Sequence, residues 1–286
     1  MESIKDLFSV LYETPILVGE GAFGKVYRLK EKASGQFYAL KVLESEAIWD
    51  KERMAMHLAD HPLFPRMIAS GKASDGFYIL MEYIWGENLR SFIERRGPLS
   101  QPDAMRIALT VADGLAFLQQ QDKGLVYRDL KAENLMISPE GEVRVLDLGC
   151  VCGLLDTGKS IAGTPEYSAP EQFDTPEGVG FYSDVYAFGK LFFYLLTGEL
   201  PEQGDLLRSY DSALSSQLEL LLYQCMREDG NTRLPDLYCV LERLIGIGSE
   251  TRLKYGIMER KARKQLAKEL SGKAEEIVFE KNLRGK

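Results

Sequence analysis

The chain has 286 residues, of which 45% are hydrophobic and 27% charged, and its formal net charge is −8. This composition indicates a globular protein that can bury a substantial core, as one large domain or two small lobes. The acidic balance argues against nucleic acid as a partner, and the four cysteines are too few and too irregularly spaced for a disulfide framework.

Residues 1–13 are predicted to be an N-terminal extension. Their apolar residues recur at helical spacing, which indicates a short helix or turn that docks on the rest of the protein. Glu2 and Asp6 stand where a signal peptide would be basic and then apolar, and residue 2 is not the glycine that myristoylation requires. We therefore expect a cytoplasmic protein.

A glycine-rich loop follows, with the sequence G-E-G-A-F-G from Gly19 to Gly24. The flanking runs, Pro15 to Val18 and Val26 to Lys30, are predicted strands. A dinucleotide-binding loop would need a helix after the glycines, and a Walker A loop would need G-K-[ST] at its end, so the sequence excludes both. Glycine has no Cβ atom, so the backbone N–H groups of such a loop can approach phosphates closely.

The next predicted strand is F-Y-A-L-K-V-L, residues 37–43, which carries Lys41 among apolar neighbours. Such a lysine lies either at an edge or buried with a partner. Strand alternation places Lys41 on the face of Ala39, which Val26 would share, so we favour a lysine that faces a ligand. A helix over residues 45–59 should follow.

Residues 77–83 form another predicted strand, and the glycine-containing stretch I-W-G-E-N-L then breaks the pattern. Ser100 and Asp103 have the spacing of a capping box and predict the start of a long amphipathic helix. That helix would deliver the chain to Leu125 and Val126.

The stretch Y-R-D-L-K-A-E-N, residues 127–134, precedes a predicted hairpin. Its strands are residues 135–137 and 143–146, and the Pro and Gly of the linking S-P-E-G-E mark a turn. Antiparallel pairing would bring Asn134, before the first strand, next to Asp147, after the second. An amide oxygen and a carboxylate are hard ligands of the kind that Mg²⁺ prefers. The carboxylate of Asp129 and the charge of Lys131 would face the same point.

Each of these residues alone could be a solvated charge on an ordinary turn, but together they resemble the catalytic loop of protein kinases, with D-L-G at residues 147–149 where the family usually has D-F-G. The glycine loop matches the family's G-x-G-x-x-G-x-V, and G-T-P-E-Y-S-A-P-E at residues 163–171 matches its segment before helix F almost letter for letter. The resemblance covers residues 14–245.

The resemblance implies an α+β, bilobal protein kinase fold. A small antiparallel β-sheet lobe plus one helix would comprise residues 14–83, and a larger, mainly α-helical lobe would comprise residues 84–245. ATP and Mg²⁺ would bind in the cleft between them. The family predicts the activity as well, namely transfer of phosphate to serine or threonine of protein substrates.

Residue roles carry over from the family motif by motif. Lys41, fixed by Glu52 on the helix, would orient the α- and β-phosphates, and Asn134 and Asp147 would hold Mg²⁺. Asp129 would accept the proton of the substrate hydroxyl and Lys131 would steady the γ-phosphate. Met81 would be the gatekeeper, Glu82 and Ile84 would offer backbone groups to adenine, and Asn88 or Glu87 would contact the ribose. The full implied nucleotide-binding set is Gly19, Gly21, Phe23, Gly24, Val26, Ala39, Lys41, Glu52, Met81, Glu82, Ile84, Asn88 and Met136.

Several contacts outside the cleft are also implied. Glu171 should form an ion pair with Arg233, and Asp184 should accept hydrogen bonds from the catalytic-loop backbone. Thr164 should contact Asp129 and Lys131.

Arg128, beside the base, suggests control by phosphorylation of the activation loop, because arginine is a ready partner for a phosphate. Thr157 and Ser160 are the sites we expect to be modified.

The apolar run at residues 181–196 comes nearest to a membrane span, but it contains Asp184 and Lys190 and is shorter than the roughly 18 residues required. Residues 246–286 form a basic tail, with 11 Lys and Arg against 6 Asp and Glu, and apolar residues at spacing four predict an amphipathic helix within it. We favour packing of this helix on the large lobe. Contact with a partner or a membrane surface is the alternative.

Two other functions stay open at this point. A pseudokinase scaffold would keep the fold and bind partners without turnover, although the intact Lys41, Asp129, Asn134 and Asp147 argue against it. A kinase that phosphorylates a small-molecule hydroxyl would keep the acidic residues, but it would not be expected to carry the motif at residues 163–171.

Overall fold

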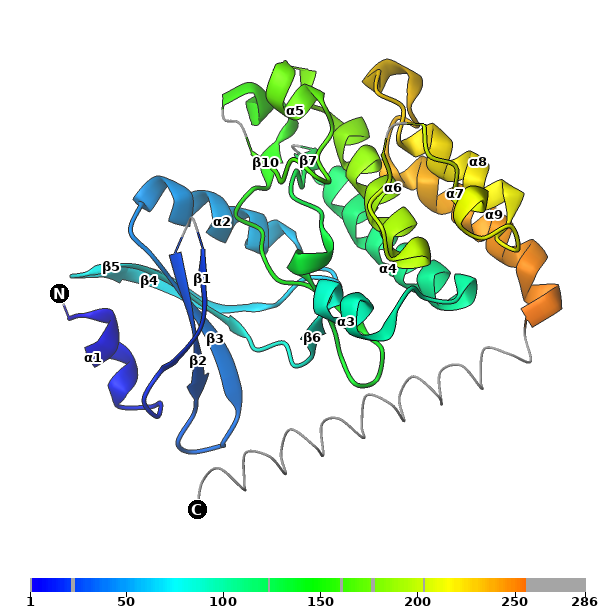
Figure 1. Ribbon diagram of the computed structural model, residues 1–286. Coiled ribbons are helices and arrows are strands. Elements are labelled where there is room, and N and C mark those ends of the chain that lie inside the picture. The colour runs from blue at the N-terminus through cyan, green and yellow to red at the C-terminus, as the bar shows by residue number, and fades with distance from the viewer. Residues whose placement is uncertain are drawn as a thin grey trace.

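The structure is a computed structural model that describes residues 2–21, 24–122, 124–159, 162–175, 178–202 and 204–255. Figure 1 shows a twisted sheet crossed by one helix, beside a group of helices that the chain enters after the last strand of that sheet. The predicted bilobal α+β fold is confirmed.

The small lobe is built on a five-stranded antiparallel sheet in the order β1-β2-β3-β5-β4. Its register places Val26 opposite Lys41 and Ala39 opposite Met81, so these side chains share one face. The first strand extends beyond the predicted end at Val18, because the glycine loop continues the ladder as far as the pair Gly21 and Gly24. The strands are β1 (Ile16–Gly21), β2 (Gly24–Lys30), β3 (Phe37–Leu43), β4 (Met67–Ala73) and β5 (Gly76–Glu82).

Helix α2 (Glu46–Leu58) is the predicted helix of this lobe. Ser45 caps its N-terminus by accepting a hydrogen bond from the N–H of Ile48. Trp49, Glu52 and Met56 are buried at spacings of three and four, which turns one face of the helix toward the sheet. The indole Nε1 of Trp49 donates to the carbonyl of Tyr78 on β5 at 3.1 Å, which fixes the helix to the sheet.

The opposite face of the sheet has a second hydrophobic core. Helix α1 (Ile4–Ser9) covers that face, as Figure 1 shows in dark blue, and confirms the predicted docking of the N-terminal extension. The backbone N–H of Ile4 donates to Asp75 Oδ1 at 2.8 Å. The buried residues of this core are Ile4, Phe8, Tyr12, Leu29, Leu40 and Leu80.

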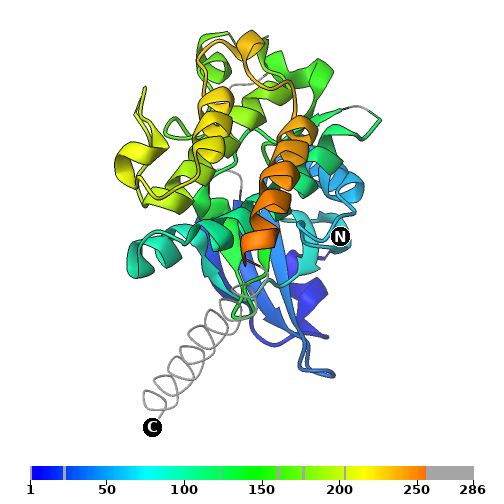
Figure 2. The ribbon, with the colours of Figure 1, turned by 90° about the vertical axis from the view of Figure 1, so that its right-hand side faces the viewer.

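The large lobe is mainly helical. Its centre is α6, which is buried along most of its length, and Figure 2 shows α8 and α9 running beside one another on the outside. Ser100 caps α4 as predicted. The helices are α3 (Leu89–Arg96), α4 (Gln101–Gln119), α5 (Glu171–Asp174), α6 (Phe181–Thr197), α7 (Leu207–Tyr210), α8 (Ser216–Cys225) and α9 (Leu237–Tyr255).

The large lobe also contains short strands and turns. The predicted hairpin is present as β8 (Leu135–Ile137) and β9 (Val143–Val145), and the N–H of Leu146 donates to the carbonyl of Asn134 at 2.9 Å. The hairpin thus brings Asn134 and Asp147 side by side. The remaining elements are β6 (Glu87–Asn88), which pairs with β8, β7 (Leu125–Val126), which pairs with β10 (Cys152–Gly153), and the 3-10 turns η1 (Ala132–Asn134), η2 (Leu154–Lys159) and η4 (Gly230–Thr232).

Helix α9 continues through residue 245, where the sequence suggested that the domain ends and a separate tail begins. The part of the tail that carries the predicted amphipathic helix lies from residue 256 onward, outside the described residues. Among the helices that are described, none is long and apolar enough to cross a membrane.

Candidate active site

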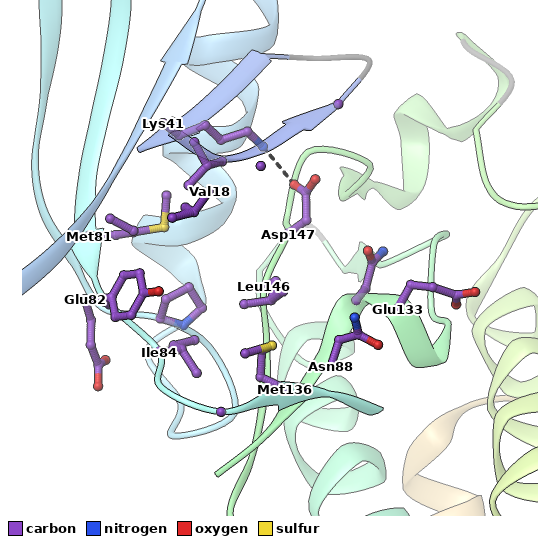
Figure 3. Close-up of a pocket in the computed structure, with 18 of the residues that line it drawn as sticks. Val18, Lys41, Met81, Glu82, Ile84, Asn88, Glu133, Met136, Leu146 and Asp147 are labelled. Atoms are coloured by element: carbon purple, nitrogen blue, oxygen red, sulfur yellow. Dashed lines mark hydrogen bonds and ion pairs between the residues drawn. The ribbon is translucent and has the colours of Figure 1, made fainter. Parts of the chain in front are cut away.

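A cavity of about 520 Å³ lies between the two lobes (Figure 3). Its size falls in the range of small-molecule and cofactor sites. It collects predicted residues that are up to 128 positions apart in the chain, from Gly19 to Asp147. The predicted residues that line it are Gly19, Gly21, Gly24, Val26, Ala39, Lys41, Met81, Glu82, Ile84, Asn88, Asn134, Met136 and Asp147.

Other lining residues were not predicted from the sequence. Val18 and Leu146 flank the cavity as apolar residues from the two lobes, and each directly precedes a motif residue, Gly19 or Asp147. That adjacency is the signal that could have identified them. The other unpredicted lining residues are Glu20, Pro65, Tyr83, Gly86 and Glu133.

The Glu82 side chain is directed away from the cavity in Figure 3. Its Oε2 accepts a hydrogen bond from Arg144 Nη2 at 2.6 Å, and the same nitrogen donates to the carbonyl of Phe64 at 3.2 Å. The N–H of Glu82 donates to the carbonyl of Arg66 at 3.0 Å. Arg144, on β9, therefore ties the stretch between the lobes to the large lobe.

An aromatic cluster lies beside the same stretch. Trp85 packs against Tyr83 with 4.8 Å between ring centroids and against Phe37 of β3 at 5.0 Å. The guanidinium of Arg28 on β2 lies 5.4 Å from the Phe37 ring and 5.9 Å from the Trp85 ring, a distance at which a cation is attracted to the ring face. Trp85 is still 52% exposed. The cluster joins β2 and β3 to the stretch between the lobes.

Lys41 is the buried cation of the cavity. Its Nζ lies 2.6 Å from Glu52 Oε1 and 2.9 Å from Asp147 Oδ1, which confirms that it has a partner on α2. Burial lowers the pKa of Lys41, but the two carboxylates outweigh burial and leave the pKa above its usual value. Burial raises the pKa of Glu52 to about 7 against the opposing effect of Lys41. Glu52, which was predicted to belong to the nucleotide-binding set, does not line the cavity itself; it contacts Lys41, which does.

Asp147 and Asn134 present oxygen atoms to the cavity. Asp147 Oδ1 accepts from Lys41 and, at 2.8 Å, from the N–H of Gly149. Burial raises the pKa of Asp147, but Lys41 and these hydrogen bonds outweigh it and lower the pKa overall. Asn134 donates through Nδ2 to the Asp129 carbonyl and to Asp129 Oδ2, both at 2.9 Å, so the amide oxygen is the atom available to a cation. An ionised carboxylate beside an amide oxygen fits Mg²⁺.

Asp129, Lys131 and Thr164 form one hydrogen-bonded group. Lys131 Nζ donates to Thr164 Oγ1 at 2.6 Å, and Thr164 Oγ1 donates to Asp129 Oδ1 at 2.7 Å. Lys131 Nζ also lies 3.2 Å from Asp129 Oδ2. The predicted contact of Thr164 with both residues is confirmed. A carboxylate, a cation and a hydroxyl group therefore converge outside the cavity lining, next to Asn134, which lines the cavity and bonds Asp129.

Asp184 on α6 anchors the backbone of this loop. Its carboxylate accepts from the N–H groups of Tyr127 and Arg128, each at 2.8 Å, as predicted. Burial raises the pKa of Asp184 to about 6, while those N–H groups lower it. Arg128 has φ of 70°, and it is the single non-glycine residue with positive φ in the described ranges. Such a conformation persists only where the surroundings fix it.

The predicted ion pair of Glu171 with Arg233 is present, with Nη1 2.5 Å from Oε1 and Nη2 3.0 Å from Oε2.

Arg128 is 2% exposed and donates through Nε to the carbonyl of Cys150 at 2.8 Å. Burial and the Arg128 guanidinium lower the pKa of Lys51 on α2, a cation that the sequence did not single out. Phe23, Ser160 and the side chain of Thr157 lie outside the described residues.

Comparison with known proteins agrees with this geometry. The family model described as "Protein kinase domain" matches residues 12–253. The chain belongs to the protein kinase family. A "cAMP-dependent protein kinase, catalytic subunit-like" of Caenorhabditis briggsae is 33% identical over 217 residues, which cover 72% of this chain and 55% of the relative.

A protein of the same description from Caenorhabditis elegans is 32% identical over 217 residues, which cover 72% of this chain and 54% of the relative. The human "cAMP-dependent protein kinase catalytic subunit PRKX" is 32% identical over 198 residues, or 66% of this kinase and 54% of the relative. The chain therefore spans about half the length of these curated relatives.

Proposed function

We propose that this kinase transfers the γ-phosphoryl group of ATP to serine or threonine hydroxyls of protein substrates. The observation that carries the proposal is the hydrogen-bonded group of Asp129, Lys131 and Thr164, which Asn134 joins to the cavity that contains the Lys41–Asp147 ion pair. Phosphoryl transfer requires little covalent chemistry from the protein, so positioning and charge stabilisation are the tasks for these residues.

Each residue has a task in this proposal. Lys41, held by Glu52 at 2.6 Å, orients the α- and β-phosphates. The Asp129 carboxylate orients the substrate hydroxyl and accepts its proton. Lys131 stabilises the charge that develops on the γ-phosphoryl oxygens. Thr164, which bonds both residues, fixes the position of their side chains relative to each other.

The metal would be held by Asn134 Oδ1 and the Asp147 carboxylate. Bound Mg²⁺ supplies neutralisation of the phosphate charge. The chain's own contribution is to keep both oxygens in place. The hairpin β8–β9 sets their separation, and the N–H of Gly149 orients the carboxylate of Asp147.

The two alternative functions have less support. A scaffold without turnover has no need for the group of Asp129, Lys131 and Thr164, which are half-buried and hydrogen-bonded to one another. Protein rather than small-molecule acceptors are favoured because residues 163–171 carry the motif typical of protein kinases, and Thr164 within it bonds Asp129 and Lys131 of the catalytic loop. The names of the relatives, which are protein kinases, agree with this choice.

Regulation by phosphorylation of the activation loop is part of the proposal. Burial and the Arg128 guanidinium lower the pKa of Lys51, and a phosphate bound to these two cations would offset their repulsion. Among the hydroxyl groups of that loop, Thr157 and Ser160 are the ones expected to be modified. If mass spectrometry of the active enzyme finds both unmodified, this form of regulation is excluded.

The experiment is transfer of label from ATP with Mg²⁺, to the kinase itself and to a generic protein substrate, for wild type and Asp129→Asn. We expect label on serine or threonine with wild type and none with the variant. Wild-type protein that binds ATP without transferring label would contradict the proposal and favour the scaffold. Label on a small hydroxyl compound alone would favour the other alternative.

A further inference from the structure

Gln172, the second residue of α5, is 2% exposed although its side chain is a polar amide. The amide Nε2 donates two hydrogen bonds, to the carbonyl oxygens of Arg128 and Ala162, each at 2.8 Å. Its Oε1 accepts from the N–H of Ala169 at 3.3 Å. Both amide hydrogens and the amide oxygen are therefore used, and none of them faces the cavity.

The two carbonyl groups belong to different functional segments. Arg128 directly precedes Asp129 in the catalytic loop, whereas Ala162 lies two residues before Thr164. Those two segments meet again at the reacting point, where Thr164 Oγ1 donates to Asp129 Oδ1 at 2.7 Å. A single amide group thus joins, from the buried side, the segments whose side chains meet in the contact between Thr164 and Asp129.

Gln172 also completes the hold on the strained residue. The N–H of Arg128 is held by Asp184 Oδ1 at 2.8 Å, and its carbonyl oxygen is held by Gln172. The positive φ of Arg128 is unfavourable for a side chain with a Cβ atom, and a buried carbonyl without a donor is unfavourable too. Asp184 and Gln172 therefore fix the two sides of the residue that orients Asp129.

The close approach at this point requires a glycine. A Cβ atom on Gly163 would lie 2.6 Å from Gln172 Nε2 and 2.9 Å from the Arg128 carbonyl oxygen, and φ of Gly163 is +124°. No side chain at residue 163 can occupy that space. The absence of a side chain is what lets the amide of Gln172 reach both carbonyl groups.

We propose that Gln172 is a positioning residue that couples the catalytic loop to residues 162–164 and so sets the contact between Asp129 and Thr164. The proposal rests on the phosphotransfer function proposed above. It requires two hydrogen-bond donors on one side chain, because the two carbonyl groups lie on separate segments. A side chain that fills the same space without these donors would not fix the relative position of Asp129 and Thr164.

The test replaces Gln172 by methionine, which is similar in size and has no donor. The matched control is Gln101→Met, since Gln101 is a partly buried glutamine that accepts from the N–H of Ser215 at 3.0 Å, between α4 and α8. We expect kcat to fall about 10- to 100-fold in Gln172→Met with the KM for ATP changed by less than about twofold, because the loss is one of orientation. Gln101→Met should leave both constants unchanged.

Amide hydrogen exchange gives a second readout that needs no activity. We expect faster exchange in residues 127–134 and 162–169 of Gln172→Met, and not in Gln101→Met. Combination with Thr164→Ala separates the roles further, because Gln172→Met should lower kcat less once the contact that it positions is gone.

The outcomes divide clearly. A kcat of Gln172→Met within about twofold of wild type, or an equal loss of ATP affinity with faster exchange across the whole domain, would overturn the coupling. A wild-type protein without phosphotransfer would refute the proposed function, while the exchange comparison would still decide the coupling. If Gln172→Met does not fold, Gln172→Asn replaces it, because its amide is one methylene too short to reach both carbonyl groups. Wild-type kcat in that variant would overturn the proposal.

Discussion

Replacing Arg233 by methionine should destabilise the large lobe strongly. The Arg233 side chain is 0% exposed and Glu171 11% exposed, and two N–H···O contacts of 2.5 and 3.0 Å join them. The guanidinium also donates to the carbonyls of Tyr182 at 3.3 Å and Glu228 at 2.6 Å, and it lies 4.8 Å from the Tyr186 ring centroid. These contacts hold α5 and α6 to the turn before α9.

The expected cost is about 3–5 kcal/mol, because removal of one partner leaves the buried carboxylate of Glu171 uncompensated. In a domain of this size that lowers Tm by roughly 10 °C. The control is Glu13→Gln, which breaks the exposed pair of Glu13 with Lys30, whose side chains are 51% and 41% exposed. An exposed pair contributes about 1 kcal/mol at most.

Thermal and urea unfolding followed by circular dichroism would measure both variants. The double variant Arg233→Met with Glu171→Gln should cost less than the sum of the single changes, because it leaves no unpaired buried charge. An Arg233→Met protein within about 1 kcal/mol of wild type, or no more affected than the surface control, would refute the reasoning.

Three further predictions concern residues that contact the cavity lining. Asp129→Asn should reduce turnover about 100-fold or more with ATP affinity unchanged, as labelled transfer and nucleotide titration would show; equal losses in both would contradict its role as a base. Arg144→Met should free the Glu82 carboxylate and raise the KM for ATP roughly 3- to 10-fold, and Arg144→Lys should restore part of it, whereas an unchanged KM would exclude a role for this ion pair. Burial raises the pKa of Glu52 to about 7, so its contribution to stability is complete below its unfolded pKa, near 4.5, and is lost as pH rises through about 7. Relative to wild type, Glu52→Gln should gain about 3 kcal/mol in urea unfolding between about pH 4 and about pH 8, and a difference independent of pH would count against the raised pKa.

Residues brought together by local patterns were predicted from the sequence. The turn residues of the hairpin β8–β9 were sufficient to place Asn134 beside Asp147. Strand alternation put Lys41 on the face of Ala39, and family spacing selected Glu52 as its partner, which the 2.6 Å contact confirms. Each inference used neighbours in a ladder or a fixed motif spacing.

The contacts of Gln172 and Arg144 were beyond such patterns. Both residues bond backbone carbonyl groups. Every residue has such a group, so the residue type of the partner gives no signal in the sequence. The partners of Gln172 lie 44 and 10 residues away, and Glu82 lies 62 residues before Arg144. Arg144 lies inside the apolar run of residues 143–146, and nothing in that run identifies Glu82 as its partner.

The course of α9 beyond residue 245 has a similar cause. The sequence suggested a boundary there because the family resemblance ends at residue 245 and a basic tail follows, and Gly246 and Gly248 each lower helix propensity by about 1 kcal/mol relative to alanine. In the structure α9 packs along α4, and a Cβ atom on Gly248 would lie 3.9 Å from the Met105 side chain. Tertiary packing therefore outweighs the local preference, and only the fold reveals it.

The two tryptophans of the sequence lie in or beside the small lobe and report on different events. Trp49 is 8% exposed on α2 with its indole bonded to Tyr78, while Trp85 is 52% exposed between two residues that line the cavity, Ile84 and Gly86. The variant Trp49→Phe keeps only Trp85, so its fluorescence would report nucleotide binding in the cavity. The variant Trp85→Phe keeps only Trp49, so its fluorescence would report displacement of α2. Stopped-flow mixing of the two unlabelled proteins with ATP could time these events separately and establish which of them comes first.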